Sequence, residues 1–155
     1  MDKQLVLAAV AGGVVGCLIT LGTTTVLSRK TTPNKEVIRL NTADPRMSGI
    51  VIHNGIVHTS GQVGELSKLE TSDVTEQTQQ TLAKIDKLLA QAGTSKSNII
   101  EARIWLKDIK SDMSAMNAVW NAWVDPDNKG TRFCVEAHLA RPTILVEVQV
   151  TAALP

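Results

Sequence analysis

The chain has 155 residues and a formal net charge of +1, and this length accommodates one ordinary domain. Nucleic-acid-binding domains usually carry a basic face and aromatic side chains on which bases stack. A near-neutral chain with three Trp, one Phe and no Tyr is poorly equipped for this. These properties argue against nucleic acid as a partner.

An uncharged and largely apolar stretch covers residues 5–27. As a helix it would span about 34 Å, which exceeds the hydrocarbon core of a bilayer at about 30 Å. We therefore predict a single membrane anchor with its flanks in residues 1–30. A secretory signal cleaved near Ser28 is the alternative.

Three basic residues follow this stretch: Arg29, Lys30 and Lys35. By the positive-inside rule they put the rest of the chain on the cytosolic or mitochondrial matrix side of the membrane. Residues 31–36 are mostly polar and include a Pro, which is typical of a linker. The remaining residues, 37–155, form the predicted domain.

The domain is expected to begin with three strands. The first is short and covers Val37–Leu40. Two apolar segments, Gly49–His53 and Ile56–Gln62, flank Asn54-Gly55. This dipeptide is the strongest short signal for a hairpin, so the second and third strands should pair.

Two helices are expected further along the chain. Asp73 and Glu76 have the spacing of a capping box. Apolar residues then recur with the helical period as far as Gly93, which is suited to ending a helix. The second helix is predicted over Met113–Val124 and stops at Asp125-Pro126. Its apolar stripe consists of Met113, Met116, Trp120 and Trp123.

Three more strands complete the prediction. Apolar and polar residues alternate over Ile100–Lys107, as in a strand with one buried face. Arg132–Leu139 and Ile144–Ala152 are predicted to pair as a closing antiparallel hairpin. The order β-β-β-α-β-α-β-β indicates an α+β fold, with two helices on one face of a mixed sheet.

The predicted hairpin also assigns side chains to the two faces of the sheet. Four apolar residues suit the face under the helices: Phe133, Val135, Ala137 and Leu139. The other face would mix polar and apolar groups: Arg132, Cys134, Glu136, His138, Leu145, Glu147, Gln149 and Thr151. Such a mixed face is suited neither to solvent nor to a second core. Burial of this face between copies of the chain would resolve this, so we expect a homo-oligomer. The expected register sets Glu147 opposite Glu136, a like-charge pair that raises a carboxyl pKa.

Four segments carry a family resemblance: TSGQV (59–63), MNAVWNAWVDP (116–126), TRFCVEAHL (131–139) and LVEVQVTA (145–152). Arg132 lies fifteen residues before Glu147. In this order and spacing the segments resemble the Rid/YjgF family of imine/enamine deaminases. The resemblance covers the chain from about residue 38 to the C-terminus.

The resemblance implies a homotrimer of chorismate-mutase-like (bacillus type) subunits with a cleft between neighbours. It also implies hydrolysis of 2-imino or 2-enamino acids to 2-keto acids and ammonia, with no metal or cofactor. Arg132 corresponds to the group that holds the substrate carboxylate, which a guanidinium binds through two parallel donors. Glu147 corresponds to the acid that activates water.

Three further residues match cleft positions of the family. Ser60 and Asn117 would give polar support to the substrate, and Cys134 would contact it through its backbone. A nucleophilic role for the Cys134 thiol is the alternative. The three His do not form a spaced set of metal ligands: His53, His58 and His138. The three Trp are interpreted as core or interface anchors: Trp105, Trp120 and Trp123.

One family feature is missing. The resemblance implies a tyrosine near the start of the domain that closes the cleft, but the chain has no Tyr and carries Asp44–Ser48 there. With the predicted anchor, this leaves a second hypothesis, a non-catalytic subunit of a larger membrane complex. A third is the endoribonuclease activity attached to the family's name, which the near-neutral charge and the scarce aromatic residues oppose.

Overall fold

A computed structural model describes residues 36–155 of the chain. The predicted anchor in residues 5–27 lies outside this range. Within it, neither helix is long and apolar enough to cross a bilayer.

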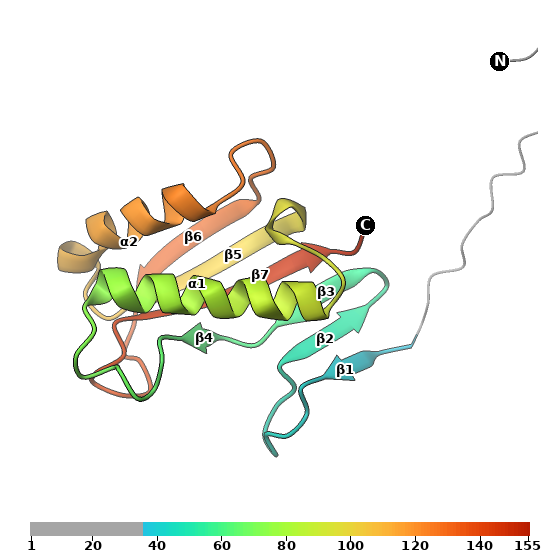
Figure 1. The fold of residues 1–155 in the computed structure, drawn as a ribbon, viewed down its shortest axis with the longest axis horizontal. Coiled ribbons are helices and arrows are strands. Elements are labelled where there is room, and N and C mark those ends of the chain that lie inside the picture. The colour runs from blue at the N-terminus through green and yellow to red at the C-terminus, as the bar shows by residue number, and fades with distance from the viewer. Residues whose placement is uncertain (1–35) are drawn as a thin grey trace, which may run out of the picture. The chain divides into compact units, whose positions relative to one another are not determined.

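The described residues form strands and helices in the predicted overall order (Figure 1). They are β1 (Ile38–Leu40), β2 (Ile50–His53), β3 (Ile56–Thr59), β4 (Gln62–Val63), α1 (Val74–Gln91), the 3₁₀ turn η1 (Lys96–Asn98), β5 (Ile99–Leu106), α2 (Ile109–Trp123), β6 (Thr131–Glu136) and β7 (Val146–Ala153). The strands make one mixed sheet in the order β1-β2-β3-β7-β5-β6, with β4 also paired to β7. Both helices cover the same face, which confirms the predicted α+β architecture.

The core lies between the two helices and the sheet. β7 is central, and its alternate residues Val146, Val148 and Val150 are fully buried beneath the helices. The apolar stripe of α1 packs against them through Leu82 and Ile85. The alternation of β7 and the helical period of α1 therefore meet in one apolar layer.

Local signals were read correctly at the hairpin and at α1. His53 pairs with Ile56, and both turn residues have positive φ, 51° at Asn54 and 75° at Gly55, as a two-residue type I′ turn requires. The carboxylate of Asp73 accepts the Glu76 N–H at 2.9 Å and caps α1.

The second helix begins one turn earlier than predicted. Asp108 caps it, because its carboxylate accepts the N–H groups of Lys110 and Ser111 at 3.0 and 3.1 Å. The prediction followed the apolar stripe, and this first turn has too few apolar residues to reveal it. Met113 belongs to the predicted stripe but is exposed.

The predicted closing hairpin is wrong, because β5 lies between β6 and β7. β6 runs parallel to β5, and β7 runs antiparallel to it. The physical reason is the α2 connection, a helical crossover that returns the chain to lie parallel to β5. Glu147 consequently lies opposite Trp105, while Glu136 pairs with Leu106 and accepts the Ile109 N–H at 3.0 Å. The like-charge pair of Glu136 and Glu147 does not exist.

The predicted faces of β6 are also reversed. Arg132 and Cys134 pair with Ala102 and Ile104, two residues buried beneath the helices. Phe133 and Val135 lie on the other face, where they are 44% and 42% exposed. β6 is an edge strand, and its polar side chain Arg132 contacts side chains of α2. A prediction that places the apolar residues under the helices therefore assigns the two faces of β6 the wrong way round. A one-residue change of phase moves every side chain of a strand to the opposite face. β6 also ends at Glu136, before the remaining residues of the predicted strand.

We call the sheet face without helices the open face. The prediction was right for β7, since Glu147, Gln149 and Thr151 alternate with its buried residues and lie on this face. The exposed apolar side chains of β6 lie on the same face.

Candidate active site

Arg132 is held at the sheet edge by two residues of α2. Its Nη1 donates a hydrogen bond to Asn117 Oδ1 at 2.8 Å. Its guanidinium carbon lies 5.3 Å from the ring centroid of Trp120. Asn117 and Trp120 are three residues apart on the helix and therefore share a face. We call Arg132, Asn117 and Trp120 the arginine cluster.

The guanidinium of Arg132 keeps most of its donors free. Within residues 36–155, Asn117 provides its one hydrogen-bond acceptor, and no carboxylate pairs with it. A guanidinium has five N–H donors. The arginine cluster therefore holds a cation that retains enough donors for a bidentate contact with a carboxylate.

Cys134 lies beside Arg132 on the same face of β6. Burial raises the pKa of its thiol, and the nearby Arg132 opposes this only in part. A mainly protonated thiol is a poor nucleophile, which weakens the nucleophilic alternative. Ala137 N–H donates to Leu106 O at 2.9 Å. Because residues of a parallel ladder alternate, the N–H of Cys134 points to the free edge of the sheet.

Glu147 is half-buried on the open face. Burial raises the pKa of its carboxyl above the ordinary glutamate range. Among the described residues it has no hydrogen-bond donor and no cation as a partner. A solitary carboxyl with a raised pKa has the properties of a general acid or base.

The TSGQ segment packs directly against this carboxyl. A Cβ added to Gly61 would collide with Glu147 Oε1 and lie 3.1 Å from Cδ. The neighbouring Ser60 accepts a hydrogen bond from Gln62 Nε2 at its Oγ, 2.8 Å away. We call Ser60, Gly61 and Glu147 the carboxylate cluster.

Thr59 explains why the chain leaves β3 at this point. Its Oγ1 donates to Val150 O at 3.3 Å and accepts Val150 N–H at 3.1 Å. A buried side chain thereby replaces a ladder partner. Regular pairing with β7 therefore stops after β3 and resumes at Gln62 of β4, opposite Val148.

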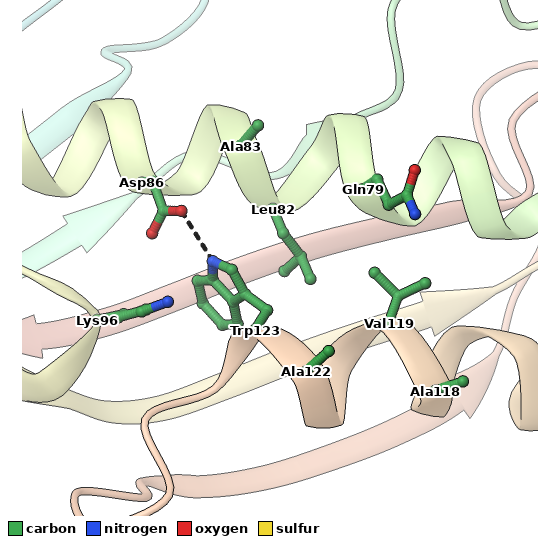
Figure 2. A pocket seen from close by; sticks show the side chains of 9 residues that line it. All are labelled: Gln79, Leu82, Ala83, Asp86, Lys96, Ala118, Val119, Ala122 and Trp123. Carbon is green, nitrogen blue, oxygen red and sulfur yellow. Dashed lines mark hydrogen bonds between the residues drawn. The ribbon is translucent and has the colours of Figure 1, made fainter.

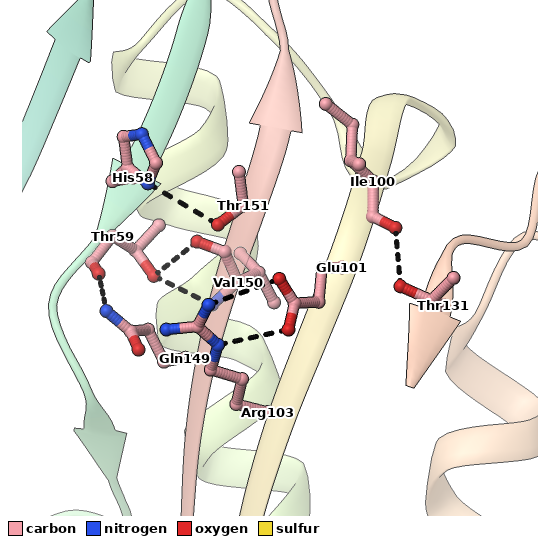
Figure 3. A network of polar contacts seen from close by, with 9 residues as sticks. All are labelled: His58, Thr59, Ile100, Glu101, Arg103, Thr131, Gln149, Val150 and Thr151. Carbon is pink, nitrogen blue, oxygen red and sulfur yellow. Dashed lines mark hydrogen bonds and ion pairs between the residues drawn. The ribbon is translucent and has the colours of Figure 1, made fainter. Parts of the chain in front are cut away.

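Other polar groups of the open face are paired within the chain (Figure 3). Arg103 donates to both carboxylate oxygens of Glu101, at 3.1 and 3.2 Å. Gln149 Nε2 donates to Thr59 O at 3.0 Å. Glu147 differs from these neighbours because its carboxylate has no such partner within the part of the chain that the structure describes.

One subunit does not bring the two clusters together. Arg132 faces the helix side and Glu147 the open face, with β5 between their strands. The offset is two strand spacings and three residues along β5, or about 10 Å in each direction. Asn117 and Cys134 accompany Arg132, and Ser60 accompanies Glu147.

Two residues of the clusters had been assigned no role at the site. Gly61 belongs to the TSGQ segment, but its contact with Glu147 exists only in the folded domain. Trp120 was interpreted as a core or interface anchor. It is buried, and it also contacts the guanidinium of Arg132. Residues 36–155 contain no group of three or more His, Cys, Asp or Glu that could hold a metal ion.

The fold and the two clusters define an α+β subunit of the chorismate-mutase-like class, with an edge guanidinium and a solitary half-buried carboxyl. Residues 39–154 match the family described as Endoribonuclease L-PSP. The chain therefore belongs to the Rid/YjgF (L-PSP) family.

Relatives and solved structures agree with this assignment. The chain is 42% identical over 109 residues to a RutC family protein of Haemophilus ducreyi, covering 70% of this chain and 90% of the relative. It is 39% identical over 118 residues to the RutC family protein YoaB of Escherichia coli K12, covering 76% and 98%. The structure of NMB1025, a YjgF family member from Neisseria meningitidis, superposes with a TM-score of 0.73 at 39% identity, covering 78% and 97%.

Proposed function

We propose that this protein hydrolyses reactive 2-imino and 2-enamino acids to 2-keto acids and ammonia. The observation that carries the proposal is Glu147, a half-buried carboxyl with a raised pKa and no partner among the described residues. The free donors of Arg132 supply the complementary group, a binding site for the substrate carboxylate.

The reaction uses the two groups in sequence. Arg132 binds the carboxylate of the 2-imino acid and orients the C=N plane. Glu147 accepts a proton from water as the water oxygen attacks the carbon of the protonated imine, which gives a neutral carbinolamine. Glu147 then returns this proton to the carbinolamine nitrogen. The C–N bond breaks, ammonia leaves, and the hydroxyl proton passes to solvent, so the 2-keto acid remains.

The site requires two copies of the chain, because the clusters lie on opposite faces of one sheet. We propose that Arg132 of one subunit meets Glu147 of a neighbour in a homotrimer. The exposed Phe133 and Val135 on the open face support this association, since apolar side chains of this size are commonly buried at interfaces.

The test is release of 2-keto acid from 2-iminopropanoate generated in situ by a serine dehydratase. The full chain should accelerate it, and Arg132→Ala should remove the acceleration. Arg103→Ala is the matched control, since Arg103 lies on the open face and its guanidinium is paired with Glu101. No acceleration over buffer, or full acceleration by Arg132→Ala, would overturn the proposal.

The missing tyrosine favours the second candidate, a non-catalytic subunit of a larger membrane complex. At the corresponding part of the chain Asp44 and Arg46 form an exposed ion pair of 2.8 Å, which lowers the pKa of Asp44 to about 2. The two side chains bond to each other, and neither of them supplies a phenol. Native gel migration separates the candidates, because a subunit of a larger complex migrates far above the mass of a trimer.

A further inference from the structure

Trp120 contacts Arg132 from the interior of the protein. It is 7% exposed, and its ring centroid lies 5.3 Å from the guanidinium carbon. This distance falls within the range of about 6 Å over which a cation is attracted to an aromatic face. The Trp120 ring therefore makes a cation–π contact with the guanidinium of Arg132.

The ring of Trp120 also contacts a second indole. Trp123 packs on Trp120 with ring centroids 5.1 Å apart and planes tilted by 58°. Its Nε1 donates to Asp86 Oδ2 of α1 at 2.9 Å (Figure 2). Trp123 also lines an open groove of about 570 Å³ between the two helices. The indole pair is thus tied to α1 and does not depend on α2 alone.

We infer that Trp120 is a positioning residue that sets the plane of the Arg132 guanidinium. Asn117 binds a single N–H and fixes one corner of the group. One hydrogen bond leaves the plane free to turn, and the ring supplies the second contact that fixes it. A guanidinium held in this way loses less side-chain entropy when it binds a carboxylate. The inference rests on the proposed function for the identity of that ligand.

The experiment compares Trp120→Leu and Trp120→Phe in the full chain, with pyruvate as the carboxylate probe. Pyruvate affinity, measured by calorimetry, should fall about threefold to tenfold in Trp120→Leu, and less in Trp120→Phe because a ring remains. KM should rise while kcat changes little. In an Arg132→Gln background the Trp120→Leu change should have no further effect on affinity, since the positioned group is gone.

Met116→Ala is the control for a general loss of stability. Met116 is fully buried one turn earlier on α2, and it should lower the unfolding midpoint while leaving pyruvate affinity unchanged. If Trp120→Leu does not fold, Trp120→Phe carries the comparison. Equal losses of affinity with and without Arg132, or a loss as large in Met116→Ala, would overturn the inference.

An NMR measurement separates this inference from the proposed function. The side-chain Nε–H resonance of Arg132 in the ligand-free protein should shift when Trp120 becomes Leu, because the ring current is lost, and should not shift in Met116→Ala. This result is independent of turnover. An inactive wild-type protein would overturn the deaminase proposal alone, whereas an unmoved Arg132 resonance would overturn the positioning role alone.

Discussion

At the scale of single residues, the stability of the fold and the proposed catalytic role oppose each other at Glu147. Burial raises the pKa of its carboxyl, so the folded state binds the proton more tightly than the unfolded state. The stability that this proton binding contributes is fully present below the unfolded pKa. It is lost as the pH rises through the raised folded pKa. Above that raised pKa the ionised carboxylate therefore destabilises the fold that positions it.

Glu147→Gln should separate the two effects. We expect the hydrolysis rate to fall by about two orders of magnitude or more, because no base remains to accept the water proton. The urea midpoint at pH 7 should equal or exceed that of the wild type, and the difference should disappear at pH 4. Glu101→Gln on the same face should retain activity. A fully active Glu147→Gln variant would contradict the catalytic assignment.

The pH profile of the wild type gives a related prediction. Glu147 must be ionised to act as the base, so the rate should fall as the pH drops through its raised pKa. The acid limb of kcat/KM should therefore lie above the value of a free glutamate, about 4.3. An acid limb at or below that value would contradict the role of burial.

Gly61→Ala should impair the site without unfolding the domain. The new methyl group would occupy the position of Glu147 Oε1, the mobile end of a flexible side chain, so the carboxylate must move. We expect at least about a tenfold loss of rate, since small misplacements of catalytic groups are costly.

Gly55→Ala is the control for Gly61→Ala, because the reverse pattern is expected of it: a loss of stability with activity retained. Gly55 has a φ of 75° with no atom within 4 Å of an added Cβ. It should lose about 1 kcal/mol of stability and keep its activity. If the two glycine variants showed the same pattern, the contact between Gly61 and Glu147 would not explain the loss.

Some residues of the candidate site could be predicted from the sequence and others could not, for a physical reason. The resemblance to the Rid/YjgF family pointed to Arg132 and Glu147. The contact of Gly61 with Glu147 depends on how far the chain bulges after β3, and the contact of Trp120 with Arg132 depends on which face of β6 meets α2. Both are properties of packing and not of local sequence.

At the scale of elements, local signals succeeded and pairing between distant segments failed. The Asn54-Gly55 turn and the Asp73 cap act within a few residues, and both were correctly read. The parallel pairing of β6 with β5 is created by the α2 crossover. The segments of β6 and β7 are adjacent in the sequence, and a predicted four-residue connection between them is typical of a hairpin. The hairpin is excluded only because β5 lies between the two strands in the sheet.

Gln77 joins α1 to the segment that leads into β7. Its side chain is fully buried, and its Nε2 donates to Thr143 O at 2.9 Å, with Leu69 O and Ser72 O each 3.2 Å away. Its Oε1 accepts the Leu145 N–H at 2.9 Å, two residues before Glu147. One amide therefore satisfies four backbone groups from two loops.

Gln77→Leu should lower the free energy of unfolding by at least about 2 kcal/mol, because buried backbone groups lose their partners. Urea denaturation measures this. Gln79→Leu is the matched control, since Gln79 is exposed on the same helix, and it should change stability by no more than about 0.5 kcal/mol. Equal effects of the two substitutions would show that the buried amide is not a structural tie.

At the scale of the whole molecule, the N-terminal segment is predicted to hold the domain at a membrane. The uncharged stretch of residues 5–27 is long enough to span a bilayer. The full chain should remain in the membrane pellet after carbonate extraction, and deletion of residues 1–30 should release it. Release of the full chain with its N-terminal peptide intact would contradict the anchor.

We propose that each active site is shared by two subunits, because the arginine and carboxylate clusters lie on opposite faces of one sheet. A site shared in this way makes the activities of two differently damaged subunits complementary, whereas a site within one chain does not.

The most direct test mixes Arg132→Ala and Glu147→Gln, each inactive alone, and reassembles them at equal concentration. Random assembly gives each site an intact Arg132 from one subunit and an intact Glu147 from its neighbour with a probability of about one quarter. Activity should therefore return to about a quarter of the wild-type value. If the mixed assemblies stay as inactive as either variant alone, the shared site is contradicted.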